Sequence, residues 1–122
     1  MVRNDVFEAN EAKKVNAPPT VARMVEDIVG CKWSLTVLLL VRKGVNRPGK
    51  IERSVSGLTT KVMNERLSKL VRYEILARVS FPEVPPRVEY ILTEFGQKFT
   101  AILDAIETLE DQRQEETLPS EN

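Results

Sequence analysis

Two strand-like runs separated by a proline-rich turn constrain the fold of this 122-residue chain more than any other feature. Residues 75–81 and 88–93 are rich in aliphatic, β-branched and aromatic side chains, and the turn between them, PEVPPR, contains three prolines. Runs of this kind favour strands, and such a short connection makes them an antiparallel hairpin. The rest of the chain shows the apolar spacing of amphipathic helices. The sequence therefore predicts a mainly α-helical protein with one small β-hairpin.

Capping residues and apolar spacing give the expected helix boundaries. Thr20 and Thr59 are plausible N-caps, and Pro48 suits the first position of a short helix. Gly30 is expected to end the helix that Thr20 begins. The helix after it is apolar nearly all round, which predicts a central position. The expected helices span residues 20–29, 32–43, 48–55, 59–73 and 94–113, after a short, weak helix at 8–15.

The order of these elements indicates the architecture. A short helix, a tight turn that contains Gly57, a second helix and a hairpin follow one another as in a winged helix-turn-helix. In that fold the second helix can enter the major groove of DNA, and the hairpin is the wing. A small helical domain with an incidental hairpin is the alternative.

The chain is long enough for one domain, flanked by terminal segments. We expect an N-terminal arm (1–19), the winged helix-turn-helix domain (20–93), a C-terminal dimerisation helix (94–113) and a disordered acidic tail (114–122). The dimerisation helix is inferred from an apolar stripe that a small domain cannot cover by itself, and this predicts a homodimer. The stripe consists of Phe95, Phe99, Ile102, Ile106 and Leu109.

The net charge is zero, with 18 basic and 18 acidic side chains, but the charges are segregated. Residues 20–90 carry 13 Lys and Arg against 7 Asp and Glu, a difference of +6. Residues 91–122 carry 2 against 8, a difference of −6. The pattern indicates a basic surface for a polyanion, with an acidic segment kept away from it. An ordinary mixed surface with an acidic C-terminus is the alternative.

The helix after Thr59 offers polar side chains opposite its apolar stripe. Asn64 could pair with an adenine and Glu65 could accept a hydrogen bond from a cytosine amine, because these groups match the base edges in the major groove. We therefore expect base contacts from Thr60, Asn64 and Glu65. Phosphate contacts are expected from Arg47, Lys50, Arg53, Lys61, Lys69 and Arg87, the last as an exposed cation of the wing tip. Merely solvated helix charges are the alternative.

Catalysis is poorly supported by the residue types present. The chain has no histidine and a single cysteine, Cys31, so histidine-based triads and a cysteine zinc site are excluded. The sequence contains no glycine-rich phosphate loop. We therefore expect no enzyme activity, no metal and no cofactor. Without a long apolar run or an N-terminal signal segment, the chain is also expected to be cytoplasmic, with no membrane partner.

Three segments resemble a known family. VEDIVGCKW at 25–33, Gly57-Leu58-Thr59 and above all PEVPPRVEYILTEFG at 82–96 are similar to the HxlR-type family of bacterial winged-helix transcription regulators. The resemblance implies a homodimer in which the N-terminal and C-terminal helices form the interface. It also implies binding to a palindromic operator in double-stranded DNA, and a role as a repressor or an activator.

The chain departs from the family pattern at several positions. Thr20 stands where many members carry a thiol-sensing cysteine, and Cys31 replaces the second glycine of a Gly-Gly-Lys-Trp motif. Glu65 replaces a common glutamine, and Tyr73-Glu74 replaces a glycine turn. The effector and the operator sequence therefore do not follow from the resemblance.

Two other functions stay open. A winged helix can bind a protein partner, and Glu65 with the zero net charge is compatible with that. Cys31 lies at a helix start beside Lys32, where a thiol can have a lowered pKa, so a redox or ligand sensor is the second open function. A small side chain that fills a helix contact is the other interpretation of Cys31.

Overall fold

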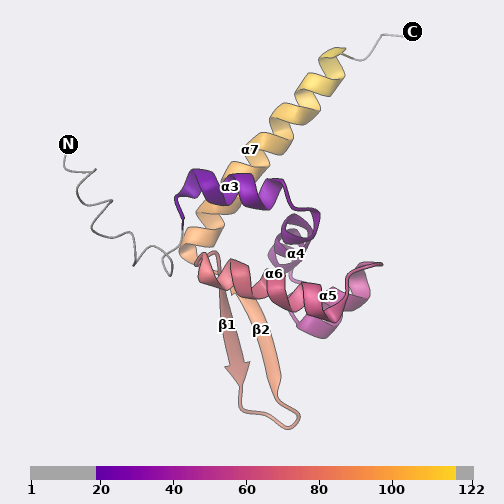
Figure 1. Ribbon diagram of the computed structural model, residues 1–122, viewed down its shortest axis with the longest axis vertical. Coiled ribbons are helices and arrows are strands. Elements are labelled where there is room, and N and C mark those ends of the chain that lie inside the picture. The colour runs from indigo at the N-terminus through magenta and orange to yellow at the C-terminus, as the bar shows by residue number, and fades with distance from the viewer. Residues whose placement is uncertain (1–18, 118–122) are drawn as a thin grey trace, which may run out of the picture.

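The computed structural model describes residues 19–117 (Figure 1). This part of the chain forms five helices and one two-stranded antiparallel hairpin, which confirms the predicted winged helix-turn-helix architecture. The elements are α3 (Val21–Val29), α4 (Lys32–Arg42), α5 (Pro48–Ser54), α6 (Thr60–Arg72), β1 (Leu76–Phe81), β2 (Arg87–Leu92) and α7 (Glu94–Thr117). The expected weak helix at 8–15 and the last five residues lie outside the described residues.

The predicted helix starts are confirmed by their caps. The side-chain oxygen of Thr20 accepts a hydrogen bond from the backbone N–H of Arg23, and that of Thr59 accepts one from Val62, both at 3.2 Å. Each bond satisfies a backbone donor that the first helical turn would otherwise leave without a partner. Pro48 opens α5, where its missing N–H costs no intrahelical bond.

Helix α4 occupies the centre of the molecule, as its all-round apolar sequence predicts. It packs against α3, α5, α6 and β2, and its own Val37, Leu38 and Val41 are buried. Helix α6 adds its inner face, on which Met63, Leu67 and Leu70 are at most 1% exposed. The rest of the core consists of Met24, Ile28, Ile51, Leu58, Tyr73, Ile75, Leu76, Tyr90, Phe99 and Leu103. Burial of this single cluster fixes α6 by its inner face and leaves its outer face to solvent.

The hairpin extends away from the helices, and its root is held by hydrogen bonds (Figure 1). Its register pairs Leu76 with Leu92 at the root and Phe81 with Arg87 at the tip. The backbone N–H of Tyr90 donates to the carbonyl of Asn46 at 2.9 Å, so the segment before α5 runs beside β2. This contact brings residues that precede α5 next to the wing.

One hydroxyl connects the ends of α6, β2 and α7. Thr93 Oγ1 donates to the carbonyl of Glu74 at 2.6 Å and accepts from the N–H of Gly96 at 2.8 Å. At Gly96 a Cβ atom would overlap the carbonyl of Ile75, so the first turn of α7 lies directly against the start of the hairpin. Glu74, which leads from α6 into β1, adopts a left-handed φ of 66°.

Helix α7 differs from its prediction in two respects. It continues through Thr117, so the start of the expected disordered tail is helical. Gln, Arg and Glu are good helix formers, and the acidic character of this segment does not end the helix. Phe99, predicted to lie at a dimer interface, is 1% exposed and belongs to the core of its own chain.

Candidate nucleic-acid interface

The outer face of α6 carries the side chains that were predicted to contact bases. Thr60, Asn64 and Glu65 are exposed, together with Lys61 and Ser68 between and beyond them. They lie opposite the buried Met63, so the core holds this set in place. The hydroxyl of Thr60 donates to a carboxylate oxygen of Glu52, which leaves only its acceptor lone pairs for another partner.

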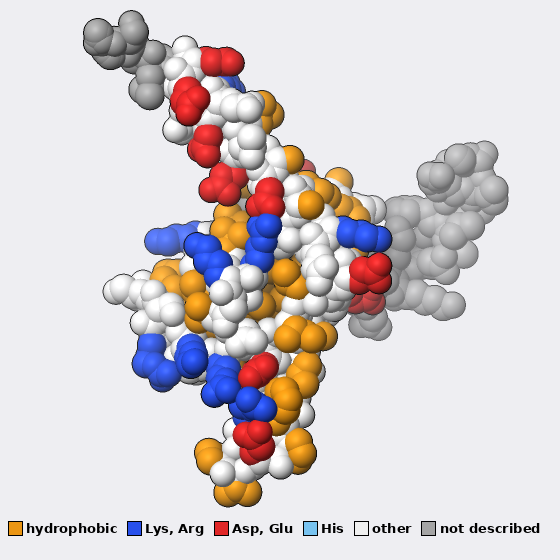
Figure 2. Space-filling model, turned by 180° about the vertical axis from the view of Figure 1, so that it is seen from behind, with side chains coloured by type: hydrophobic (Ala, Val, Ile, Leu, Met, Phe, Trp, Pro, Cys, Tyr) orange, Lys and Arg blue, Asp and Glu red, His pale blue; other side chains and the backbone are white. Residues whose placement is uncertain are grey.

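Three cations next to this face are available to an anion. Lys50 and Arg53 on α5 and Lys61 on α6 are exposed, and no carboxylate among residues 19–117 lies within ion-pair distance of them. Figure 2 shows a row of Lys and Arg side chains beside the hairpin, whereas Asp and Glu side chains gather along the projecting part of α7. The segregation expected from the sequence is therefore present on the surface.

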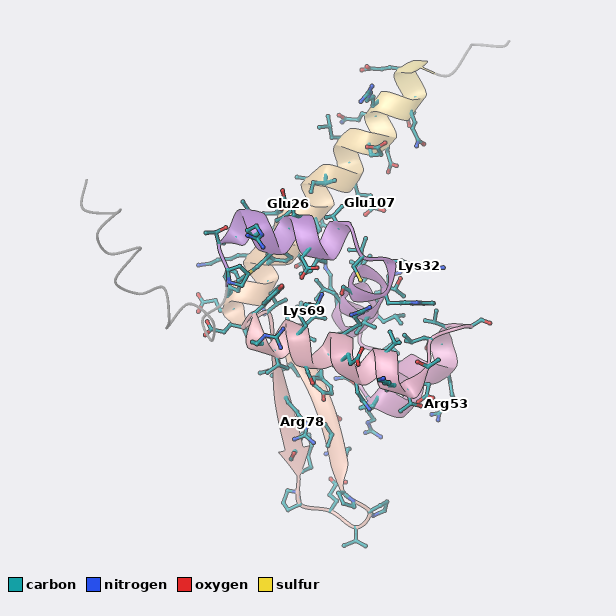
Figure 3. The ribbon with its side chains drawn as sticks, viewed as in Figure 1. Glu26, Lys32, Arg53, Lys69, Arg78 and Glu107 are labelled. Carbon is teal, nitrogen blue, oxygen red and sulfur yellow. The ribbon has the colours of Figure 1, made fainter. Side chains whose placement is uncertain are left out.

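Lys69, predicted to contact phosphate, has a different partner. Its ammonium lies 3.0 and 3.1 Å from the two carboxylate oxygens of Asp27 on α3, and the hydroxyl of Tyr73 donates to the same carboxylate. Figure 3 shows Lys69 between α6 and α3, whereas Arg53, which belongs to α5, lies beside the opposite end of α6. Lys69 therefore ties α6 to α3, and a phosphate that contacts Lys69 would have to compete with Asp27.

The cluster of Asp27, Lys69 and Tyr73 shifts two pKa values. Burial alone would raise the pKa of Asp27, but the Tyr73 hydroxyl, Lys69 and Arg66 outweigh it and hold the pKa below its ordinary value. Burial and the Asp27 carboxylate raise the pKa of Tyr73 to about 12. Sequence reasoning missed this cluster. The sequence feature that could have indicated it is Asp27, an acid three residues after Met24 and directly before Ile28, at the edge of the apolar face of α3.

Arg87 is not the exposed wing-tip cation that was predicted. Its guanidinium stacks on the ring of Phe81, 3.9 Å from the ring centre, and pairs with Glu83 at 2.9 Å and Glu89 at 3.3 Å. Glu89 also pairs with Arg47, at 3.4 Å. The exposed tip of the wing is instead apolar, because Val84 between these groups is fully exposed.

Cys31 lies at the start of α4 and is half-buried. Burial alone would raise the pKa of its thiol, but hydrogen bonding by Ser34 and the charges of Arg66 and Lys69 outweigh it, so the pKa lies below its ordinary value. The two cations belong to α6. Two charges on the helix that carries the candidate base contacts therefore act on the Cys31 thiol.

A second apolar surface remains exposed on α7. Ile102, Ile106 and Leu109 are 41%, 39% and 65% exposed, and Phe95 at the start of the helix is half-buried. A groove of about 360 Å³ runs between α7 and the α3–α4 pair, and Val29 is among its lining residues. Apolar area of this extent on a small domain is typical of an interface.

The described residues define a winged helix-turn-helix protein with a basic, polar outer face on its second helix. The chain belongs to the HxlR-like helix-turn-helix family, whose model matches residues 28–117. None of the helices within residues 19–117 is both long and apolar enough to span a membrane.

Individual relatives agree with this assignment. The HTH-type transcriptional regulator sll1512 of Synechocystis is 39% identical over 85 residues, which are 70% of this chain and 63% of that protein. The chain thus spans less than two thirds of that relative. A transcriptional regulator of the MarR family from Enterococcus faecalis is similar in structure, with a TM-score of 0.72 and 27% identity over 78% of this chain and 86% of that chain. The redox regulator HypR in its reduced form gives a TM-score of 0.67 and 25% identity over 78% and 94%.

Proposed function

We propose that this protein is a sequence-specific, DNA-binding transcription regulator that acts as a homodimer. The observation that carries the proposal is the outer face of α6, where Asn64 and Glu65 are exposed. Lys61 on the same helix and Lys50 and Arg53 on α5 have no carboxylate partner among the described residues. The family membership of the chain supports the same function.

In this proposal α6 enters the major groove of DNA. The amide of Asn64 pairs with the N6 and N7 edge of an adenine, and the carboxylate of Glu65 accepts from the N4 amine of a cytosine. Lys50, Arg53 and Lys61 contact phosphates and fix the position of the helix on the duplex. The buried inner face of α6 keeps these groups in one arrangement, which lowers the entropy lost on binding.

The test is a fluorescence-anisotropy titration with genomic fragments selected by the protein and with scrambled duplexes. Asn64→Ala should cost on the order of 1–3 kcal/mol on a selected fragment and little on scrambled DNA. Glu94→Gln, a change on an exposed side chain of α7, serves as the control. Equal loss on both duplexes would show that Asn64 does not read a base, and no binding at all would refute the proposal.

The dimer is proposed to form along α7, with α3 contributing. Ile102, Ile106 and Leu109 supply the exposed apolar side chains, and two-fold dimers are the commonest assembly. Two copies of α6 would then read two half-sites of a palindromic operator. We expect Ile102→Asp with Ile106→Asp to give monomers or an unfolded chain. Sedimentation of the unmodified chain as a monomer at micromolar concentration would exclude this dimer.

Thiol sensing at Cys31 is a second candidate function. It is favoured by the lowered pKa of the thiol, and one similar structure is that of a redox regulator. We nevertheless expect mild peroxide or diamide to leave DNA affinity nearly unchanged, because Thr20 stands at the position of the sensing cysteine in similar regulators. A strong oxidant response that Cys31→Ser abolishes would establish the sensor.

A further inference from the structure

Two glutamates of the wing neutralise Arg87 at its tip and Arg47 just before α5. Glu83 lies 2.9 Å from Arg87, while Glu89 lies 3.3 Å from Arg87 and 3.4 Å from Arg47. The four side chains sum to zero charge. The side chain of Glu89 is only 19% exposed, so its pairs are partly protected from solvent and salt.

Three of these four side chains line a concave site, and Glu89 pairs with both of its arginines. A notch of about 430 Å³ lies between the wing tip and the start of α5, and its lining includes Arg47, Glu83 and Arg87. This volume is sufficient for a phosphate group with its sugar. The guanidinium fork binds carboxylate and phosphate in the same geometry, so the glutamate oxygens occupy the positions that phosphate oxygens would take.

Arg87 cannot leave this arrangement without cost. Its guanidinium lies 3.9 Å from the centre of the Phe81 ring, and its side chain is 29% exposed. A cation that swings out to reach a distant phosphate loses the stacking contact and both carboxylates. A phosphate must therefore enter the notch and displace a carboxylate, because the arginine does not reach out to meet it.

We infer that Glu83 and Glu89 determine the selectivity of DNA binding by competing with phosphate for Arg47 and Arg87. The inference rests on the proposed function. In a loosely docked complex on random DNA, the nearby carboxylates keep Arg47 and Arg87, and these two arginines contribute no phosphate contact. In the complex with a matched sequence, α6 sits fully in the groove and presses one phosphate into the notch. The wing contact thus forms only after the bases have been read.

The test uses Glu83→Gln, Glu89→Gln and the double variant of the 122-residue chain, with Glu94→Gln as the matched control. Glu94 loses the same charge, but its side chain is 88% exposed and only reaches Lys98 at 4.0 Å. Each protein is titrated with a labelled scrambled duplex and with a fragment selected by the unmodified chain, between about 0.05 and 0.2 M salt. Glu83, which is half exposed, can be replaced without disturbing the more buried Glu89.

The expected result is a selective gain on scrambled DNA. Each freed phosphate contact should raise affinity for the scrambled duplex roughly tenfold near 0.1 M salt and steepen the salt dependence by about 0.9 units. Affinity for the selected fragment should rise less, so the ratio between the two duplexes falls.

The inference is overturned if the glutamine variants behave like Glu94→Gln, or if both duplexes gain equally. In either case the unmodified chain still binds DNA and the proposed function stands. If neither the unmodified chain nor any variant binds either duplex, the proposed function itself fails. Thermal melting of every variant confirms that the compared proteins are folded.

Discussion

The α5–α6 face and the wing both carry basic side chains, but they differ in whether carboxylates neutralise them. Both carry arginine or lysine among polar residues, yet Lys50, Arg53 and Lys61 have no carboxylate partner in the described part of the chain, whereas Arg87 of the wing and Arg47 beside it each have at least one. The difference arises from strand geometry. Arg87 and Glu89 are two residues apart on β2 and therefore share one face of the hairpin. Counting cations along a sequence thus overstates the positive charge of a hairpin.

Disrupting the root of the wing should have the largest effect. Gly96→Ala would place a Cβ against the carbonyl of Ile75, and backbone cannot move aside as a flexible side chain can. We expect a loss of about 3 kcal/mol or more in the free energy of unfolding, or failure to fold. Gly49→Ala is the control, because its Cβ would meet only the mobile end of Arg53. Circular-dichroism melting compares them, and unchanged melting of Gly96→Ala would contradict the tight contact.

A second experiment tests the contact that holds the C-terminal end of α6 against α3. Asp27→Asn removes the carboxylate that holds Lys69 and Tyr73, and we expect it to cost about 1–3 kcal/mol, as for hydrogen bonds to charged groups. The pKa of Asp27 is lowered in the folded state, so its contribution is full above its unfolded pKa of about 3.9 and is lost as pH falls through the folded value.

The difference in stability between Asp27→Asn and the unmodified chain should therefore be constant near neutral pH and shrink below about pH 4. Denaturant titrations at several pH values measure it. Glu26→Gln, on the exposed neighbour of Asp27, should show a much smaller change. A difference that persists unchanged into acid would mean that the charge of Asp27 is not responsible.

Replacing one cation of each region by alanine tests the comparison directly. Lys61→Ala should weaken binding to all duplexes roughly tenfold and reduce the salt slope by about 0.9, with stability changed by less than about 0.5 kcal/mol. Arg87→Ala should instead lower stability by about 1 kcal/mol, since it removes the stacking on Phe81 and two ion pairs. Its affinity for scrambled DNA should hardly change. Melting and anisotropy data that reversed this pattern would restore the exposed wing-tip cation expected from the sequence.

The smallest effect is expected where the two regions join. Glu74 adopts a φ of 66°, which costs a residue with a Cβ more than it costs glycine. Glu74→Gly should therefore stabilise the fold by about 0.5–1 kcal/mol, while Glu74→Ala, which keeps a Cβ, should not. A lower melting temperature for Glu74→Gly would show that the turn is not strained.

Local signals explain what could be predicted from the sequence. Thr20, Thr59 and Pro48 mark helix starts through interactions within one turn, and apolar spacing placed Met63, Leu67 and Leu70 in the core. The strands were found because β-branched and aromatic residues cluster there. These features depend on neighbours in sequence, so they can be read without a structure.

The sequence could not predict partners that are distant along the chain or placed by strand register. Lys69 meets Asp27 across 42 positions, and the packing of α7 on the core decides that Phe99 is buried rather than available to a second chain. The sequence predicts an exposed Arg87, because its stacking on the cross-strand neighbour Phe81 and its pair with Glu83 follow only from the folded hairpin. The outer face of α6 could be predicted from the sequence, because the buried apolar stripe of a helix determines which residues lie on the opposite face.

The hydroxyl of Thr93 has a mechanical consequence. By bonding to Glu74 and to Gly96 it joins the end of α6, the hairpin root and the first turn of α7 into an elbow with little freedom to bend. A 24-residue helix is about 36 Å long at 1.5 Å per residue, so α7 is a long lever on one side of that elbow. The hairpin is the shorter arm on the other side. Because the elbow is stiff, we expect a change in the direction of α7 relative to a partner to change the direction of the wing as well.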